Sequence, residues 1–184
     1  MPVSEETFER VALEDPDGKW ELHCGRLRNK PGMTTRHNLI GVVLGYRLQQ
    51  QLPLEEYIVS GDRAYVRFSP TRTYIPDIAV IPRTLIDDME RYHPDRLEVH
   101  QAPLPLVVEV WSPSTGKEDF TDKLPGYQER GDAEIWLIHP RERTLRTFVR
   151  QPDGSYIESI YRGGTVRPAA LPNVNIELDE LFRL

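Results

Sequence analysis

The sequence contains a single cysteine, Cys24, among its 184 residues. One cysteine excludes an internal disulfide and any metal site that is built from a cluster of cysteines. Lysine is also scarce, because only four of the 23 basic residues are lysine and the other 19 are arginine. The position of each lysine (19, 30, 117 and 123) is therefore informative.

The sequence also lacks long apolar runs and an excess of positive charge. No apolar run approaches the roughly 20 residues that a membrane-spanning helix needs, so we expect no membrane association. The acidic N-terminal segment has no apolar core like that of a secretory signal, which favours a cytoplasmic protein. A net charge of −6 argues against non-specific coating of nucleic acid, but it is compatible with a local basic groove.

The length and the uniform composition predict one domain. A chain of 184 residues can bury a substantial core but is too short for two ordinary domains. It contains no internal repeat, low-complexity tract or interdomain linker. We therefore predict a single domain over residues 1–184, in which residues 1–17 form a loose N-terminal segment.

Hydrophobic periodicity predicts helices that alternate with runs of strands. We expect a hairpin at 20–29, a helix beginning at Thr34 or Thr35, a surface helix within 83–102, a strand at 105–111, a helix ending at Gly131, and strands between 133 and 161. Residues 73–82 are apolar on both faces apart from Asp77, as in one central strand. These elements predict an α/β fold with a mixed sheet between helices.

Residues 57–70 predict a strand, a turn and a second strand. In the second strand, three apolar side chains alternate with a basic and aromatic set that comprises Arg63, Tyr65 and Arg67. This basic set is suited to following a DNA backbone through charge and stacking. A solvated edge strand has the same pattern, and we favour the edge strand.

Two carboxylates lie within apolar segments. Glu109 interrupts "LPLVVEVW" (104–111), where an unpaired buried carboxylate would cost several kcal/mol. Asp77 interrupts the segment 73–82. If the two strands are neighbours, directly opposed positions are only about 5 Å apart, and the two anions repel each other. A shared proton or a bound cation relieves that repulsion, and carboxylate oxygens suit Mg²⁺ or Mn²⁺.

Each carboxylate also has a structural interpretation. Asp77 follows Pro76, and a Pro-Asp pair often marks only a turn or the start of a strand. Glu109 has many arginines with which to pair. Replacing Asp77 with Asn distinguishes these cases: it should raise stability without metal if the carboxylates repel each other, and lower it if Asp77 is paired with an arginine. The occurrence of both carboxylates in apolar segments favours a cation site.

Several motifs resemble the Uma-type family of putative restriction endonucleases, which lies within the PD-(D/E)XK nuclease superfamily. The resemblance rests on "PDIAVI" (76–81), "EVWSPST" (109–115), Lys123 with Tyr127, and "GDAEIWLIHP" (131–140). The segments "WELHCGRL" and "RHNLIG" are similar to upstream segments of that family. The similarity extends over roughly residues 18–184, and the combined motif is far more specific than a bare "PD…E".

The resemblance implies a restriction-endonuclease-like mixed sheet, flanked by helices and extended by additional N- and C-terminal strands. It also implies a divalent-metal-dependent DNA endonuclease. In that activity Asp77, Glu109 and the backbone carbonyl of Val110 would bind Mg²⁺ or Mn²⁺. Lys123, from the helix after the Glu109 strand, would orient the attacking hydroxide and stabilise negative charge on the phosphate.

Two positions depart from the patterns of these nucleases. The classical superfamily has lysine two residues after the glutamate, where this chain has Trp111, and the Uma-type pattern takes its lysine from the following helix. His139 stands where the family usually has aspartate, and we expect it to have a structural role near a turn. Lys117 lies in a glycine-containing loop, where we expect a solvated side chain.

Three other polar residues are secondary candidates. His37, at the start of the first predicted helix, is either a buried or capping histidine or a substrate contact. We expect Tyr127 to serve in packing and Glu21 to lie on the surface.

Besides the DNA endonuclease, two functions stay open: a binding or assembly module without turnover, and a metal-dependent hydrolase of another phosphoester. A homodimer is a general expectation for enzymes that cut both DNA strands.

Overall fold

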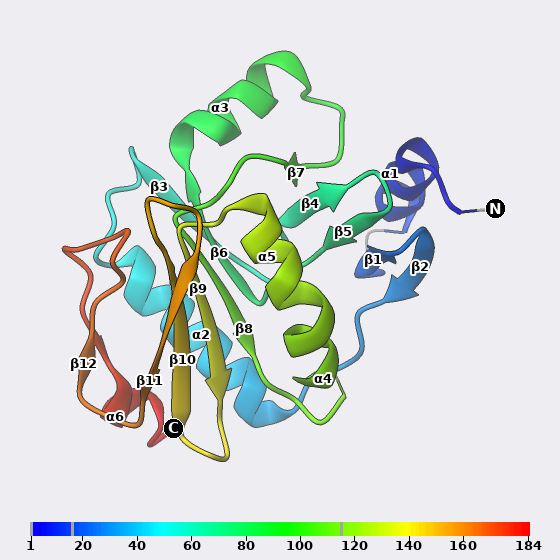
Figure 1. Ribbon diagram of the computed structural model, residues 1–184. Coiled ribbons are helices and arrows are strands. Elements are labelled where there is room, and N and C mark those ends of the chain that lie inside the picture. Colours follow the sequence, from blue (N-terminus) through cyan, green and yellow to red (C-terminus); the bar gives the residue numbers. More distant parts are fainter. Residues whose placement is uncertain (1, 16, 115) are drawn as a thin grey trace.

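A six-stranded mixed sheet forms the centre of the protein (Figure 1). The computed structural model describes residues 2–15, 17–114 and 116–184. In spatial order the strands of this sheet are β11 (Tyr156–Tyr161), β10 (Thr144–Arg150), β9 (Glu134–His139), β8 (Leu106–Val110), β6 (Ile78–Pro82) and β3 (Tyr57–Gly61). The pair β8 and β9 is parallel, and the other neighbours are antiparallel. The predicted mixed α/β fold is therefore confirmed.

Helices cover both faces of this sheet, with α5 (Leu124–Arg130) in front of it and α2 (Thr35–Gln49) behind it in Figure 1. The helix α2 begins as predicted, because the Thr34 side chain accepts a hydrogen bond from the amide of His37. Its buried residues, spaced for one helical face, pack against the sheet: Ile40, Leu44 and Leu48. On the other face, Leu124 and Tyr127 of α5 pack against alternate residues of β6 and β8.

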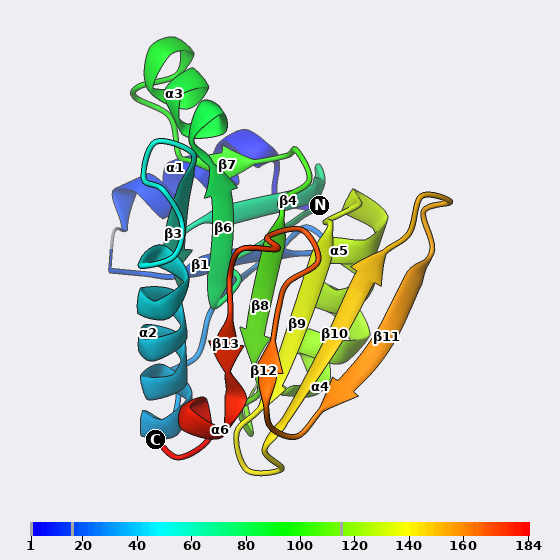
Figure 2. The ribbon, with the colours of Figure 1, turned by 90° about the vertical axis from the view of Figure 1, so that its left-hand side faces the viewer.

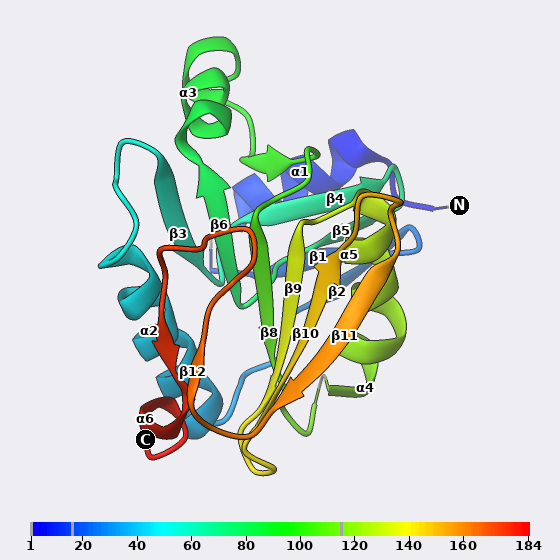
Figure 3. The ribbon, with the colours of Figure 1, turned by 60° about the vertical axis from the view of Figure 1, so that its left-hand side comes forward.

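A second sheet has five strands, which run across those of the large sheet (Figures 2 and 3). Its strands, in spatial order, are β2 (Arg26–Asn29), β1 (Trp20–His23), β5 (Arg72–Tyr74), β4 (Tyr65–Ser69) and β7 (Val99–His100). The hairpin of β1 and β2 was predicted, and its turn places Cys24 and Gly25 at positive φ. This sheet brings the N-terminal hairpin to one end of β6 and β8.

The remaining elements are short or lie at the surface. The predicted surface helix is α3 (Arg83–Tyr92), and the predicted stop at Gly131 is confirmed by its φ of 87°. The other elements are α4 (Gly116–Glu118), the π-helix η1 (Asp119–Lys123), β12 (Thr165–Val166), β13 (Ile176–Glu177) and α6 (Leu178–Leu181). None of the helices that the structure describes has the length and apolar character of a membrane-spanning segment.

The prediction of one central strand at 73–82 is wrong. The segment is divided between β5 in the small sheet and β6 in the large one, and it crosses from one to the other at residues 75–77. Pro76 cannot donate a ladder hydrogen bond, which accounts for the break. Asp77 therefore lies directly before β6 and not in the middle of a strand.

The predicted solvated face is wrong at Tyr65 and Arg67, which are buried, whereas Arg63 is exposed as predicted. The prediction of a loose N-terminal segment is also wrong. Residues 5–14 form the helix α1 (Glu5–Glu14), which covers β4. Arg67 is 6% exposed and forms ion pairs with Glu5 at 3.1 Å and with Glu9 at 3.0 Å. The Tyr65 ring meets Phe8 of α1 edge to face. Moreover, β4 lies between β5 and β7, so it is not an edge strand.

We predict that Arg67→Met destabilises the protein by about 2 kcal/mol, because it removes one cation from the buried carboxylate of Glu9 and leaves Arg96 as its partner. Urea unfolding measures this change. Arg10→Met is the matched control, since the pair of Arg10 with Glu14 is exposed and should contribute less than about 1 kcal/mol. Equal effects of the two substitutions would contradict the assignment of Arg67 as the anchor of α1.

Candidate active site

The two predicted carboxylates lie opposite each other across β6 and β8. In this antiparallel pair Ile78 faces Val108 and Ala79 faces Val107, and the same register continued by one residue places Asp77 opposite Glu109. Because side chains alternate along a strand, Glu109 points to the same face as Val107, which α5 covers. Asp77 lies directly before β6, and its carboxylate contacts His37 of α2. Asp77 is 5% exposed and Glu109 is 2% exposed.

Asp77 is held by two cationic side chains and one amide. Its Oδ1 accepts from Lys30 Nζ at 2.8 Å, and its Oδ2 lies 2.9 Å from His37 Nε2. Oδ2 also accepts from the amide of Val110 at 2.7 Å, which places this residue beside the carboxylate. Burial raises the pKa of Asp77, but Lys30 and His37 lower it by more, so its pKa falls well below the usual range. The carboxylate is therefore ionised.

Lys30 is a central residue that the sequence analysis missed. It follows β2 directly, is 6% exposed, and also donates to Asp62 Oδ1 at 2.6 Å and to the carbonyl of Ile75 at 2.9 Å. Burial lowers the pKa of Lys30, but Asp77, Glu109 and Asp62 raise it by more, so the net shift is upward. The only signal in the sequence was the scarcity of lysine, which did not indicate a partner.

Glu109 is held from the helical side by two residues of one segment. Its Oε1 accepts from the hydroxyl of Tyr127 at 2.5 Å and lies 3.3 Å from Lys123 Nζ. Lys123 ends η1 and Tyr127 lies four residues later in α5, a spacing that places both on one helical face. Burial and the charge of Glu109 raise the pKa of Tyr127 well above its usual value, so the phenol keeps its proton. Tyr127 is buried as expected, and it also holds the carboxylate.

Glu21 is a third carboxylate of the cluster, and the prediction that it lies on the surface is wrong. It is 4% exposed on β1, and its Oε1 lies 3.2 Å from Lys123 Nζ and accepts from the amide of Ile75. Its Oε2 lies 2.9 Å from His23 Nε2. Burial raises the pKa of Glu21, but Lys123, His23 and Lys30 lower it to about 2.

The other candidates separate into buried and peripheral residues. His37 is buried in the first turn of α2, where burial lowers its pKa but Asp77 raises it by more, giving a net increase. Trp111 stacks on His139, with ring centroids 4.3 Å apart. His139 ends β9 and accepts from the amide of Glu142 at the following turn. Lys117 is exposed, in agreement with its expected solvation.

The charges of the buried cluster are largely balanced within the protein. Three buried carboxylates (Glu21, Asp77 and Glu109) meet two buried ammonium groups (Lys30 and Lys123), with His37 and His23 in contact. The prediction of two mutually repelling anions is therefore replaced by a network of ion pairs. Asp77 is paired within the protein, as in the structural interpretation, but its partners are a lysine and a histidine and not an arginine. Asp77→Asn should therefore lower stability.

The donors of the cluster have the right chemistry for a divalent cation, because Mg²⁺ and Mn²⁺ prefer carboxylate oxygens. In the described part of the chain, however, no three His, Cys, Asp or Glu side chains are grouped closely enough to hold a metal ion. Lys30 Nζ lies 2.8 Å from Asp77, where a cation would also bind. A divalent ion thus fits the donor type and requires an ammonium group to move away.

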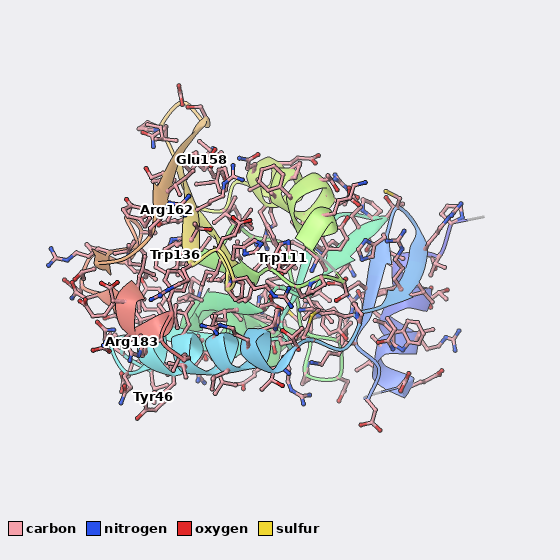
Figure 4. The ribbon with its side chains drawn as sticks, turned by 90° about the horizontal axis from the view of Figure 1, so that it is seen from below. Tyr46, Trp111, Trp136, Glu158, Arg162 and Arg183 are labelled. Carbon is pink, nitrogen blue, oxygen red and sulfur yellow. The ribbon has the colours of Figure 1, made fainter. Side chains whose placement is uncertain are left out.

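A cavity of about 430 Å³ opens beside Glu109. Its lining includes Trp111, Phe120, His139 and Arg146. Figure 4 shows the protein from below, and Trp111 lies near the middle of this view. Glu109 thus contributes to both the buried ion-pair network and the lining of the cavity.

Comparison with known proteins identifies a family and similar solved structures. The model of the Uma2 family, described as "Putative restriction endonuclease", matches residues 5–179. The fold is similar to the crystal structure of a putative nuclease belonging to DUF820 from Anabaena variabilis ATCC 29413, with a TM-score of 0.79 and 18% sequence identity over 99% of this chain and 98% of that chain. Comparison with curated proteins gave no match.

We predict that Glu21 makes stability sensitive to acid. Its pKa of about 2 lies below the ordinary 4.5, so its contribution is complete above pH 4.5 and is lost as the pH falls toward 2. This contribution is on the order of 3 kcal/mol. Urea unfolding at several pH values should show wild type losing its advantage over Glu21→Gln in this interval. Glu14→Gln, at an exposed carboxylate, is the control, and a difference between wild type and Glu21→Gln that is independent of pH would contradict the assignment.

Proposed function

The chain belongs to the Uma2 family of putative restriction endonucleases, and we propose that its buried cluster is the active centre of a divalent-metal-dependent DNA endonuclease. The observation that carries the proposal is the position of Asp77 opposite Glu109, with Lys123 in contact with Glu109 and Glu21. Two carboxylates and a lysine are the groups that metal-assisted hydrolysis of a phosphodiester requires. The proposed substrate is DNA.

In this proposal Asp77, Glu109 and the backbone carbonyl of Val110 would hold Mg²⁺ or Mn²⁺. The bound ion would supply charge neutralisation at the phosphodiester and a lower pKa for a coordinated water. Lys123 orients the attacking hydroxide and stabilises the charge that develops on the phosphate oxygens. A compact ammonium group suits this role better than the planar guanidinium of arginine.

The surrounding residues hold these groups in position. Tyr127 donates to Glu109 and restricts the orientation of its carboxylate. Glu21 lies 3.2 Å from Lys123 Nζ, and the amide of Ile75 fixes Glu21 in turn. His37 and the Val110 amide orient Asp77. His37 therefore serves in this proposal as a positioning residue, in place of the substrate contact suggested by the sequence.

A catalytically inactive binding or assembly module is the second candidate function, and one specific observation favours it. Lys30 and Lys123 already compensate the carboxylates that would bind a metal ion. In such a protein the cluster would be a structural ion-pair network.

For the nuclease, a symmetric homodimer that acts in the cytoplasm and cuts both strands is part of the proposal.

We expect purified protein to nick supercoiled plasmid DNA in the presence of Mg²⁺ or Mn²⁺. Asp77→Asn, Glu109→Gln and Lys123→Met should each lower the rate by about 100-fold or more, because each removes a charge that acts on the metal ion or the phosphate. Lys117→Met is the matched control, since this exposed lysine lies in the same segment as Lys123 and should leave the rate unchanged. Folded wild-type protein that cleaves with neither metal ion would contradict the proposal.

The two candidate functions differ in how Lys30→Met responds to a metal ion. This substitution leaves Asp77 without its ammonium partner, so without metal we expect a loss of about 3 kcal/mol in the free energy of unfolding. In a nuclease, Mn²⁺ should raise the Tm of Lys30→Met by more than that of wild type, because the ion then binds without displacing lysine.

The double variant Lys30→Met with Asp77→Asn is the control for this experiment. It should recover part of the stability, because no buried charge is left unpaired, and its Tm should not respond to Mn²⁺. A Tm that is independent of Mn²⁺ in wild type and in both variants would favour the structural network over the metal site.

A further inference from the structure

The cavity beside Glu109 is large enough for a small organic ligand. Its volume of about 430 Å³ falls within the range of roughly 300–1,000 Å³ that is typical of ligand sites. It lies at the end of β8, where Trp111 follows the strand, and is bounded across the sheet by His139 and Arg146 of β9 and β10. The proposed catalytic mechanism makes no use of this space.

Four of the lining residues carry flat aromatic or guanidinium groups: Trp111, Phe120, His139 and Arg146. The Trp111 indole and the His139 imidazole are stacked, with an angle of 22° between their planes. The guanidinium of Arg146 lies over the ring of Phe120 at 4.6 Å, and Phe120 is 42% exposed. Flat surfaces of this kind bind heteroaromatic rings through stacking and cation–π contact.

The indole is also fixed in place. A side chain at Gly116 would overlap the Trp111 ring, so the backbone of α4 lies directly against it. His139 accepts a hydrogen bond from the Glu142 amide, which restrains the second ring of the stack. A restrained aromatic surface loses little conformational entropy when a ligand binds.

The charges around the cavity favour a neutral ring over a phosphate. The guanidinium of Arg146 is paired with Glu158 at 2.6 Å, and two carboxylates, Glu109 and Glu142, contribute to the lining. A phosphate group would meet these anions without an unpaired arginine to offset them. A nucleobase offers both donors and acceptors to the same groups, and it carries no net charge.

We propose that this cavity receives an unpaired nucleobase of a DNA strand, with the adjoining backbone reaching the cluster at Glu109. The inference rests on the proposed nuclease function and specifies its substrate: single-stranded DNA, or a duplex from which one base is extruded. Glu109 connects the two sites, because it lines the cavity and contacts both Lys123 and Tyr127. Trp111, at the classical lysine position, thereby becomes a residue that binds the substrate.

Binding of a single-stranded oligonucleotide of about eight nucleotides tests the inference. The assay is fluorescence anisotropy with Ca²⁺ in place of Mg²⁺. Trp111→Ala should weaken the affinity by roughly 5- to 100-fold through loss of stacking, and Trp111→Phe should restore most of it. Tyr46→Ala is the matched control, because this exposed aromatic residue points outward from α2 and should leave the affinity unchanged (Figure 4).

Abasic oligonucleotides identify the group that occupies the cavity. Removing the base that enters it should weaken binding to wild type and cause no further loss in Trp111→Ala, since the two changes remove the same contact. Equal penalties in both proteins, or an unchanged affinity of Trp111→Ala for the intact strand, would overturn the inference. A free deoxynucleoside monophosphate that binds as tightly as the strand would also overturn it.

The binding and plasmid assays together distinguish failure of the nucleobase site from failure of the nuclease function. Nicking by wild type, together with a Trp111→Ala variant of unchanged affinity for single strands, would leave the nuclease function intact and remove the nucleobase site. Binding that depends on both Trp111 and the base, without cleavage in any metal ion, would leave the nucleobase site and remove the nuclease function.

Discussion

The ion pair of Lys30 with Asp77 is the interaction on which the arrangement of the site depends. Lys30 follows the N-terminal hairpin of the small sheet, and Asp77 precedes β6 of the large one. The same ammonium group also contacts Asp62 and the carbonyl of Ile75, so it joins the two sheets where the chain crosses between them. An unpaired carboxylate at this depth would cost several kcal/mol, and the pairing keeps Asp77 ionised in the interior.

The rest of the cluster follows from this constraint. With Asp77 fixed, the register of β6 and β8 places Glu109 opposite it, and the segment from η1 to α5 supplies Lys123 and Tyr127. The two lysines compensate the three buried carboxylates, and in the proposed nuclease they would have to move away when a divalent ion binds. This arrangement makes the ammonium groups part of the proposed chemistry, since metal affinity depends on how readily they leave the carboxylates.

Sequence and structure agree most closely where a local pattern has one physical solution. The stripe of α2, its start at Thr34 and the stop at Gly131 were predictable from periodicity and capping alone. The hydrophobic pattern wrongly predicted one strand at 73–82, because an apolar run does not reveal that the chain passes from one sheet to another. It failed at Arg67 because a basic face has the same sequence whether it is covered by water, by DNA or by the acidic helix α1.

By itself, the sequence determined most of the helices (α1 is the main exception), most of the strands and the identity of the two carboxylates in apolar segments, because these depend on neighbours within a few positions along the chain. It also indicated Lys123, through the spacing of a family motif. Only the tertiary structure decided that Glu21 and Lys30 belong to the same cluster. Glu21 accepts from the amide of Ile75, 54 positions away, and Lys30 pairs with Asp77, 47 positions away. The crossing of the two sheets brings these distant residues together.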